Sequence, residues 1–115
     1  MKRGEVYLAD LAPRSGSEQQ GRRPAIVLSH DSFNREPNWR SVIVVPLSTS
    51  QRQARRGPTA VALPRGAGGL QRDSVALCHQ VTTVDRSKLL DFLGVLPDDL
   101  LGAVDEGLKI ALDLH

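Results

Sequence analysis

The chain has 115 residues with 40% hydrophobic and 24% charged side chains, a size and composition that predict a single globular domain over residues 1–115. Its one cysteine excludes an intrachain disulfide, its three scattered histidines predict no metal site, and the lack of a ~20-residue apolar run or a signal-peptide core predicts a cytoplasmic protein. The net charge of +2 hides an uneven distribution, because residues 1–72 carry 12 basic and 5 acidic side chains whereas residues 73–115 carry 3 and 8.

The basic side chains of residues 1–72 are arginines in eleven of the twelve cases. A planar guanidinium matches the geometry of a phosphate, so this composition favours a phosphate-bearing partner such as a nucleic acid. Arginines that only keep the surface soluble are the alternative. Aromatic residues make up 3% of the chain, so a nucleic-acid site here cannot depend mainly on stacking platforms.

Strand-like segments fill the first half of the chain. Glu5–Leu8 alternates polar and apolar residues, which predicts a half-buried strand. Residues 13–22 are rich in Gly, Ser, Gln and Arg and predict a long mobile loop. Residues 24–29 and 41–47 are apolar and rich in β-branched types, so we expect two central strands there. The connection between them, residues 30–40, is polar and contains turn residues.

Shorter segments follow, separated by turns rather than by long helices. In order, we expect an arginine-rich loop over residues 51–57, a strand over 59–63, a Gly/Pro-rich connection over 64–69, strands over 74–78 and 80–84, and a short helical turn over 85–89. Such a succession predicts an antiparallel sheet or a small barrel.

The last segment has helical periodicity. Pro97 can start a helix, and Asp98 and Asp99 then lie in its first turn, where negative charge suits the helix dipole. Gly102 and Gly107 each weaken this helix by up to ~1 kcal/mol relative to alanine, so it needs packing against the sheet. Apolar residues recur at three- and four-residue spacing and form one stripe: Leu100, Leu101, Val104, Leu108, Ala111 and Leu112.

Four strings of residues, in this order, resemble the MazF/PemK family of toxins. The strings are Arg3-Gly4-Glu5-Val6-Tyr7 with Asp10-Leu11; Gly16-Ser17-Glu18-Gln19 leading into Arg23-Pro24-Ala25-Ile26-Val27-Leu28-Ser29; Val44-Val45-Pro46-Leu47-Ser48-Thr49; and Arg72-Asp73-Ser74-Val75 with Gln80 just beyond. The acidic C-terminal helix also fits, so the resemblance covers essentially the whole chain.

The resemblance implies a mainly β fold with a C-terminal helix, in which antiparallel strands form the compact SH3-like barrel of the CcdB, Kid and MazF toxins. It implies a homodimer that acts in the bacterial cytoplasm. It further implies sequence-specific cleavage of single-stranded RNA without a metal or other cofactor, by attack of a 2′-hydroxyl on the adjacent phosphate. Finally, it implies a cognate MazE-like antitoxin whose C-terminal segment covers the RNA site.

Arg23 matches the catalytic arginine of the family. It stands where the expected mobile loop meets a rigid strand, and a guanidinium there suits the extra negative charge of the transition state. Its pKa above ~12 makes it a poor base, and pairing with a carboxylate is the alternative role.

The family usually has a threonine after the strand reading Pro-x-Thr, whereas this chain has Ser48 followed by Thr49. The two side chains face opposite sides of a strand, so one of them points into the site, and we favour Ser48 over Thr49. Ordinary strand-end caps are the alternative for both.

His79 occupies a position where some family members carry a catalytic acidic residue. A histidine there can move protons near neutral pH, or it can serve in base stacking or packing. Cys78 is expected to be a small buried residue rather than a nucleophile.

Further residues are candidates for RNA binding. Glu18, Gln19, Gln20 and Gln80 carry groups that can read the edges of splayed bases. Arg52, Arg55 and Arg56 are placed to follow the phosphate backbone, or to form a solvated loop. Phe33 and Trp39 are expected at a dimer contact or as core anchors.

Two other functions are alternatives. A gyrase-poisoning toxin shares this fold and cleaves nothing, acting chiefly through the C-terminal end of its chain. A small barrel that binds nucleic acid without chemistry is a further alternative. The Arg-Pro string, with a hydroxyl residue at the matching strand end, favours the nuclease over both.

Overall fold

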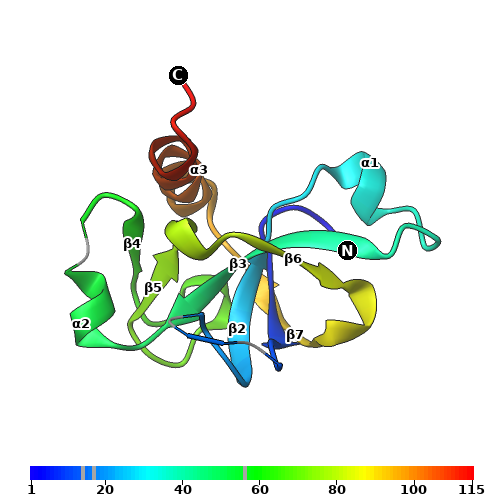
Figure 1. Ribbon diagram of the computed structural model, residues 1–115, viewed down its shortest axis with the longest axis horizontal. Coiled ribbons are helices and arrows are strands. Elements are labelled where there is room, and N and C mark those ends of the chain that lie inside the picture. The colour runs from blue at the N-terminus through cyan, green and yellow to red at the C-terminus, as the bar shows by residue number, and fades with distance from the viewer. Residues whose placement is uncertain (14, 17, 56) are drawn as a thin grey trace.

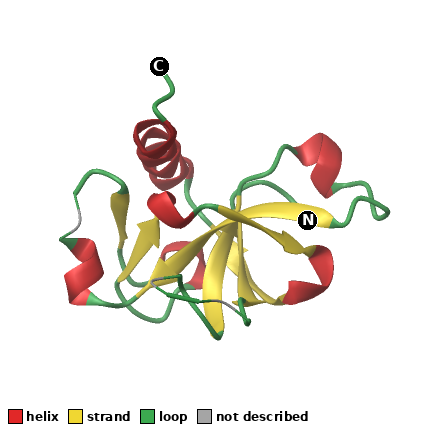
Figure 2. Cartoon of the chain, in the orientation of Figure 1, coloured by secondary structure: helices red, strands yellow, loops and turns green. Residues whose placement is uncertain are grey.

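The computed structural model describes residues 1–13, 15–16, 18–55 and 57–115. A strongly coiled sheet carries one long helix and several short ones (Figures 1 and 2). The strands are β1 (Glu5–Asp10), β2 (Arg22–Val27), β3 (Ser41–Ser48), β4 (Ala60–Leu63), β5 (Ser74–Leu77), β6 (Thr82–Asp85) and β7 (Leu89–Val95). The helices are α1 (Asp31–Asn34), α2 (Gln51–Ala54), α3 (Asp98–Leu112) and the 3₁₀ turns η1 (Ala67–Gly69), η2 (Cys78–Gln80) and η3 (Arg86–Lys88).

Strand β3 lies at the centre of the sheet. The strand order is β4-β5-β3-β2-β1-β7, with β6 paired to β3 beside β5, and every pairing is antiparallel. β3 therefore pairs with β2 along one side and with both β5 and β6 along the other. The predicted mainly β fold with a C-terminal helix is confirmed.

The two faces of β3 are buried in two different apolar clusters. Val45 and Leu47 pack in a cluster that also contains Val104 of α3, whereas Val42 and Val44 pack in a second cluster with β1 and β6 residues. Alternate side chains of a strand point to opposite faces, so a strand buried on both sides shows an unbroken apolar run. This explains the apolar residues Val42, Val44, Val45 and Leu47 of β3, whereas Ile43 in the same run is 43% exposed.

Helix α3 covers the cluster of Val45 and Leu47 and begins directly after Pro97, with Asp98 and Asp99 in its first turn, as predicted. Its two glycines differ. A Cβ on Gly107 would lie 2.8 Å from the Cys78 sulfur, so this glycine lets the helix approach η2 closely, whereas Gly102 faces open space. At the N-terminal side of the sheet, the Arg3 guanidinium forms an ion pair with Asp105 and so joins α3 to the start of β1.

The structure differs from the sequence prediction at several segments. β7 was not predicted, and its Leu89–Val95 sequence shows neither strict alternation nor a helical period. The strand expected over residues 80–84 begins only at Thr82, and the loops expected over residues 30–40 and 51–57 contain α1 and α2. Phe33 and Trp39 stack at 4.9 Å and are 43% and 47% exposed, so neither is a core anchor. In the described ranges, no helix is long and apolar enough to cross a membrane.

The two helix glycines allow a matched test of this packing. We expect Gly102→Ala to raise the free energy of unfolding by about 0.5–1 kcal/mol, because alanine restricts the unfolded chain and meets nothing in the fold. We expect Gly107→Ala to lower it by about 1–3 kcal/mol, because the new methyl overlaps the Cys78 sulfur. Urea unfolding measures both, and equal shifts of the same sign would contradict this description of α3.

Candidate active site

The register of the β2–β3 pairing, extended past its last paired residues, puts Arg23 and Ser48 on one face. Ala25 lies opposite Pro46 in the β2–β3 ladder, and continuing this register by two residues sets Arg23 opposite Ser48. Two residues along a strand return to the same face, so the two side chains share the face of Pro46. Arg23 is half-buried and Ser48 is 5% exposed.

Thr49 lies on the other side of this end of β3. It lines two cavities that neither Ser48 nor Pro46 lines. The Ser48 hydroxyl oxygen accepts the Ser50 N–H at 3.1 Å, which engages a lone pair of the oxygen and not its hydrogen. The geometry therefore supports Ser48, rather than Thr49, as the hydroxyl beside Arg23.

Turn η2 results from a change of register along β3. Ser48 pairs with Val75 of β5, whereas Val44 pairs with Thr82 of β6. Between these two pairs β3 has three residues (45–47), but the segment that joins β5 to β6 has six (76–81), an excess of three. The three extra residues form η2, which carries His79 and Gln80 outward from the sheet. The excess of three residues is the reason why His79 and Gln80 lie beside the Pro46 face.

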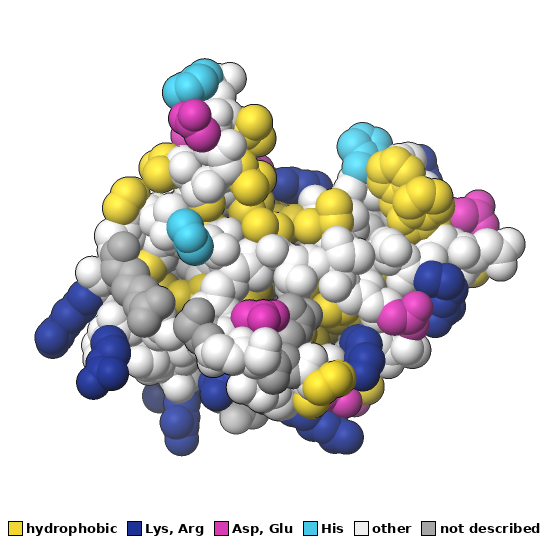
Figure 3. All heavy atoms as spheres, in the orientation of Figure 1, with side chains coloured by type: hydrophobic (Ala, Val, Ile, Leu, Met, Phe, Trp, Pro, Cys, Tyr) yellow, Lys and Arg dark blue, Asp and Glu magenta, His cyan; other side chains and the backbone are white. Residues whose placement is uncertain are grey.

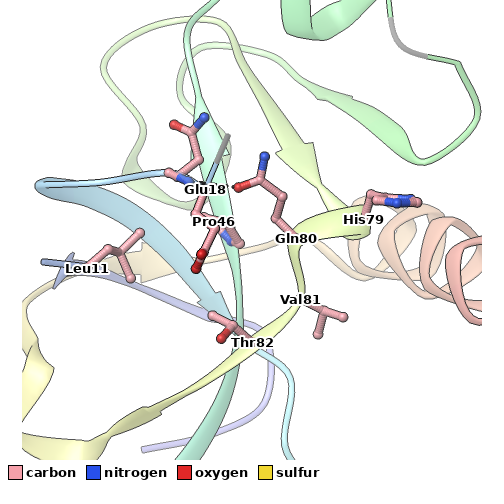
Figure 4. A pocket seen from close by; sticks show the side chains of 8 residues that line it. Leu11, Glu18, Pro46, His79, Gln80, Val81 and Thr82 are labelled. Atoms are coloured by element: carbon pink, nitrogen blue, oxygen red, sulfur yellow. Dashed lines mark hydrogen bonds between the residues drawn. The ribbon is translucent and has the colours of Figure 1, made fainter. Parts of the chain in front are cut away.

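A pocket of about 300 Å³ lies between the β1–β2 loop, β3 and η2 (Figure 4). We call it the loop pocket, and it is lined by Leu11, Glu18, Gln19, Pro46, His79, Gln80, Val81 and Thr82. The Gln80 carboxamide points toward the loop and accepts the Gln19 N–H at 2.9 Å, whereas the His79 ring points away from Gln80, toward the C-terminal helix. A second hollow of about 340 Å³ continues the pocket toward Asp10, Asp85 and Lys88.

Arg23 is also in contact with the β1–β2 loop. Its Nε donates to the Gln20 carbonyl at 3.0 Å. The loop is thus attached on two sides, by Gln80 through Gln19 and by Arg23 through Gln20. A ligand that engages the Nε of Arg23 must replace the Gln20 carbonyl.

None of the candidate arginines that the structure describes lines the loop pocket, and neither does Ser48. Arg52 belongs to α2 and Arg55 follows it; both are exposed, and α2 adjoins β4 and β5 rather than the loop pocket. Arg56 lies outside the described residues. Figure 3 shows that Lys and Arg side chains gather along the lower and left edges of the molecule, around α2 and the loops at that end of the sheet. In the described part of the chain, Arg22, Arg52, Arg55, Arg65 and Arg72 form no ion pair.

Cys78 is unsuited to nucleophilic chemistry. Its side chain is fully buried beneath α3, and burial raises the pKa of the thiol to about 11. The thiolate is therefore scarce at neutral pH. Among the described residues, no group of three or more His, Cys, Asp or Glu side chains is arranged to hold a metal ion.

Four residues of the loop pocket were missed by the sequence analysis: Leu11, Pro46, Val81 and Thr82. Pro46 lies two residues before Ser48, so strand alternation alone gives the signal that the two share a face. Leu11 directly follows β1 and Thr82 begins β6, segments that are distant in the sequence, and no local pattern indicates that they meet.

The fold is that of a small, mainly β protein, with a coiled antiparallel sheet and a C-terminal helix. Its candidate site is basic, because Arg23 lies against the β1–β2 loop. Comparison with protein families is more specific: residues 2–112 match the family described as PemK-like, MazF-like toxin of type II toxin-antitoxin system. The chain belongs to this family, as the sequence strings predicted.

Individual relatives agree with this assignment. The chain is 41% identical over 114 residues to the endoribonuclease EndoA of Bacillus subtilis (strain 168), a match that covers 99% of this chain and 96% of EndoA. A crystal structure of MazF from Deinococcus radiodurans is similar with a TM-score of 0.80 and 29% identity, covering 98% of this chain and 96% of that one. An endoribonuclease from a mycobacterial species, solved in complex with its cognate antitoxin, is similar with a TM-score of 0.74 and 26% identity, covering 100% and 95%. These comparisons give no support to the gyrase-poisoning alternative.

The contact between Gln80 and the β1–β2 loop can be tested directly. Gln80→Met keeps the length of the side chain but removes the acceptor of the Gln19 N–H. We expect exchange of the Gln19 amide hydrogen to become about fivefold faster, which corresponds to the loss of about 1 kcal/mol of net hydrogen-bond energy. Gln51→Met, at an exposed position of α2, is the control. Unchanged exchange at Gln19 in both variants would show that the bond does not hold the loop.

Proposed function

We propose that this chain is the toxin of a bacterial type II toxin–antitoxin pair, a single domain over residues 1–115 that acts in the cytoplasm as a sequence-specific endoribonuclease on single-stranded RNA. The observation that carries the proposal is the full-length match to a family whose relatives include a named endoribonuclease, together with Arg23 and Ser48 on one face.

In the proposed reaction, the 2′-oxygen attacks the adjacent phosphorus, forming a 2′,3′-cyclic phosphate and releasing the 5′-oxygen. The Arg23 guanidinium stabilises the additional negative charge on the phosphoryl oxygens of the transition state. The Ser48 hydroxyl donates its hydrogen to one of the same oxygens. Both groups project from paired strands, so little reorganisation accompanies the reaction.

The protons move through water in this mechanism. A protonated guanidinium has no site to accept a proton, and the His79 ring points away from the centre of the loop pocket. Water at the mouth of the pocket therefore accepts the 2′-hydroxyl proton and returns one to the departing 5′-oxygen. His79 contributes by contact with the RNA rather than by proton transfer.

RNA recognition is assigned to the loop pocket and its basic surroundings. Glu18, Gln19, Gln20 and Gln80 offer carboxylate, amide and backbone groups to base edges. Arg52, Arg55 and Arg56 attract the phosphate backbone in this proposal. Arg52 lies in α2 and Arg55 directly after it, and the lack of an ion pair for these two in the described chain supports the role.

We further propose two protein partners. The first is a second copy of the chain: Figure 3 shows apolar side chains gathered between α3 and α1, and Phe33, Trp39 and Ile43 are each more than 40% exposed. The second is a MazE-like antitoxin, supported by the similar mycobacterial endoribonuclease in complex with its cognate antitoxin. The antitoxin inhibits the toxin by covering the loop pocket.

Arg23→Ala tests the assignment of the charge-stabilising group. We expect the wild-type protein to cut a long RNA at specific sites in EDTA, and Arg23→Ala to fold normally but cut at least 100-fold more slowly. Arg35→Ala, at an exposed arginine after α1, is the matched control and keeps full activity. Full activity of Arg23→Ala would refute the mechanism, and inhibition of gyrase supercoiling without RNA cuts would refute the function.

Ser48 and Thr49 can be separated by the same assay. We expect Ser48→Ala to lower kcat by about 100-fold, because one hydrogen bond to the transition state is lost. Thr49→Ala changes kcat by less than about threefold, because its side chain lies on the opposite face. The reverse order of the two effects would assign the hydroxyl to Thr49.

A further inference from the structure

A further cavity is lined by Pro24 and Thr49, which alternate with Arg23 and Ser48 along the chain and so belong to the opposite face. We call it the η1 cavity; it has a volume of about 370 Å³ and is lined by Leu8, Pro24, Thr49, Gly69, Leu70, Gln71, Arg72, Ser74 and Leu93. It shares no lining residue with the loop pocket. The proposed reaction assigns it no role.

Close backbone contact between η1 and β7 builds one wall of this cavity. A Cβ on Gly69 would lie 2.0 Å from the Leu93 carbonyl oxygen, and Gly69 has a φ of +77°, so this position requires glycine. The contact holds Leu70, Gln71 and Arg72 along the side of the sheet. The Ser74 hydroxyl donates to the Arg72 carbonyl at 3.0 Å and fixes the backbone of that wall.

The cavity combines an apolar floor with a cationic rim. Leu8, Pro24, Leu70 and Leu93 supply only aliphatic surface, and the rim carries the exposed Gln71 and Arg72. Arg72 forms no ion pair within the described ranges. Arg22 adds a second cation, since it shares the face of Pro24 by strand alternation.

This combination suits one nucleotide. A nucleobase presents flat apolar faces and a hydrogen-bonding edge, and its phosphate is an anion at a fixed short distance. Aliphatic side chains pack against the faces, the Gln71 carboxamide meets the edge, and guanidinium groups bind the phosphate or stack on the base.

The cavity adjoins the proposed reaction centre. By the extended β2–β3 register Ser48 shares a face with Arg23, and the next residue, Thr49, lines the η1 cavity. Ser48 and Thr49 are consecutive residues, so an RNA strand that crosses this end of β3 contacts both the proposed reaction centre and the η1 cavity. We propose that the η1 cavity binds the base of a nucleotide next to the scissile phosphate, with Arg72 on its phosphate. This inference rests on the proposed function and adds a specificity site to it.

Photocrosslinking locates the base. The cut site is first mapped, and the oligonucleotide is then made with a 2′-deoxy nucleotide at the cut, so that it binds without reacting. A 4-thiouridine or 6-thioguanosine is placed in turn at each nucleotide flanking the cut, and near-ultraviolet irradiation of the wild-type complex is followed by peptide mapping. We expect an adduct within residues 69–72 or at Leu93 for one of these positions. Adducts confined to loop-pocket residues at every position would overturn the inference.

A pair of arginine variants tests the contribution of the rim. We expect Arg72→Ala to raise KM for the mapped RNA about tenfold, with the salt dependence of binding reduced by about 0.7 in log–log slope, the amount expected for one lost phosphate contact. Arg65→Ala is the control, an exposed arginine that precedes η1 and does not line the cavity. Equal kinetics of the two variants would overturn the inference while leaving the nuclease function intact.

Two further outcomes distinguish the alternatives. If Arg72→Ala weakens binding of the antitoxin but leaves KM for RNA unchanged, the cavity holds an antitoxin side chain and the inference is overturned. If the wild-type protein cuts no RNA, the proposed function fails and this inference fails with it.

Discussion

The antiparallel register between β2 and β3 is the constraint on which the site depends. Ala25 opposite Pro46 sets Arg23 opposite Ser48 and turns Thr49 to the other face. A slip of one residue would exchange Ser48 for Thr49 and would also turn the apolar residues of β3 out of their clusters, so the core itself enforces the register. The chemistry of the site and the stability of the fold thus depend on the same pairing.

The charges of the chain are used in two ways. Arg3 is paired with Asp105, and Arg40 is paired with Asp85, whose pKa is lowered chiefly by the hydroxyl and N–H of Ser87 and also by Arg40. These arginines hold elements together. Arg23, Arg52 and Arg72 lie around the end of β3 without an ion pair in the described chain, so their charge remains available to an anionic ligand.

Four elements, β1, β2, β3 and α3, were predictable from the sequence. Each has a clear hydrophobic pattern, either that of a strand or the three- and four-residue spacing of a helix. β7 was missed because Leu90, Phe92 and Val95 are exposed although apolar, so burial does not impose an alternating pattern on it. Gln80 was expected within a strand, but it lies in η2, because the three-residue excess between the β5 and β6 ladders is a property of pairing and not of local sequence.

By itself, the sequence determined the residue types of the site, the family to which the chain belongs, and the rule that Ser48 and Thr49 point in opposite directions. Only the tertiary structure bears on which of the two shares a face with Arg23, because that follows from the register between strands whose paired residues are some twenty positions apart. The tertiary structure also decided that the Gln20 carbonyl contacts Arg23 and that Arg72 stands at a cavity beside Thr49. These are contacts between distant segments, and the packing of the whole sheet selects them rather than any local preference of the chain.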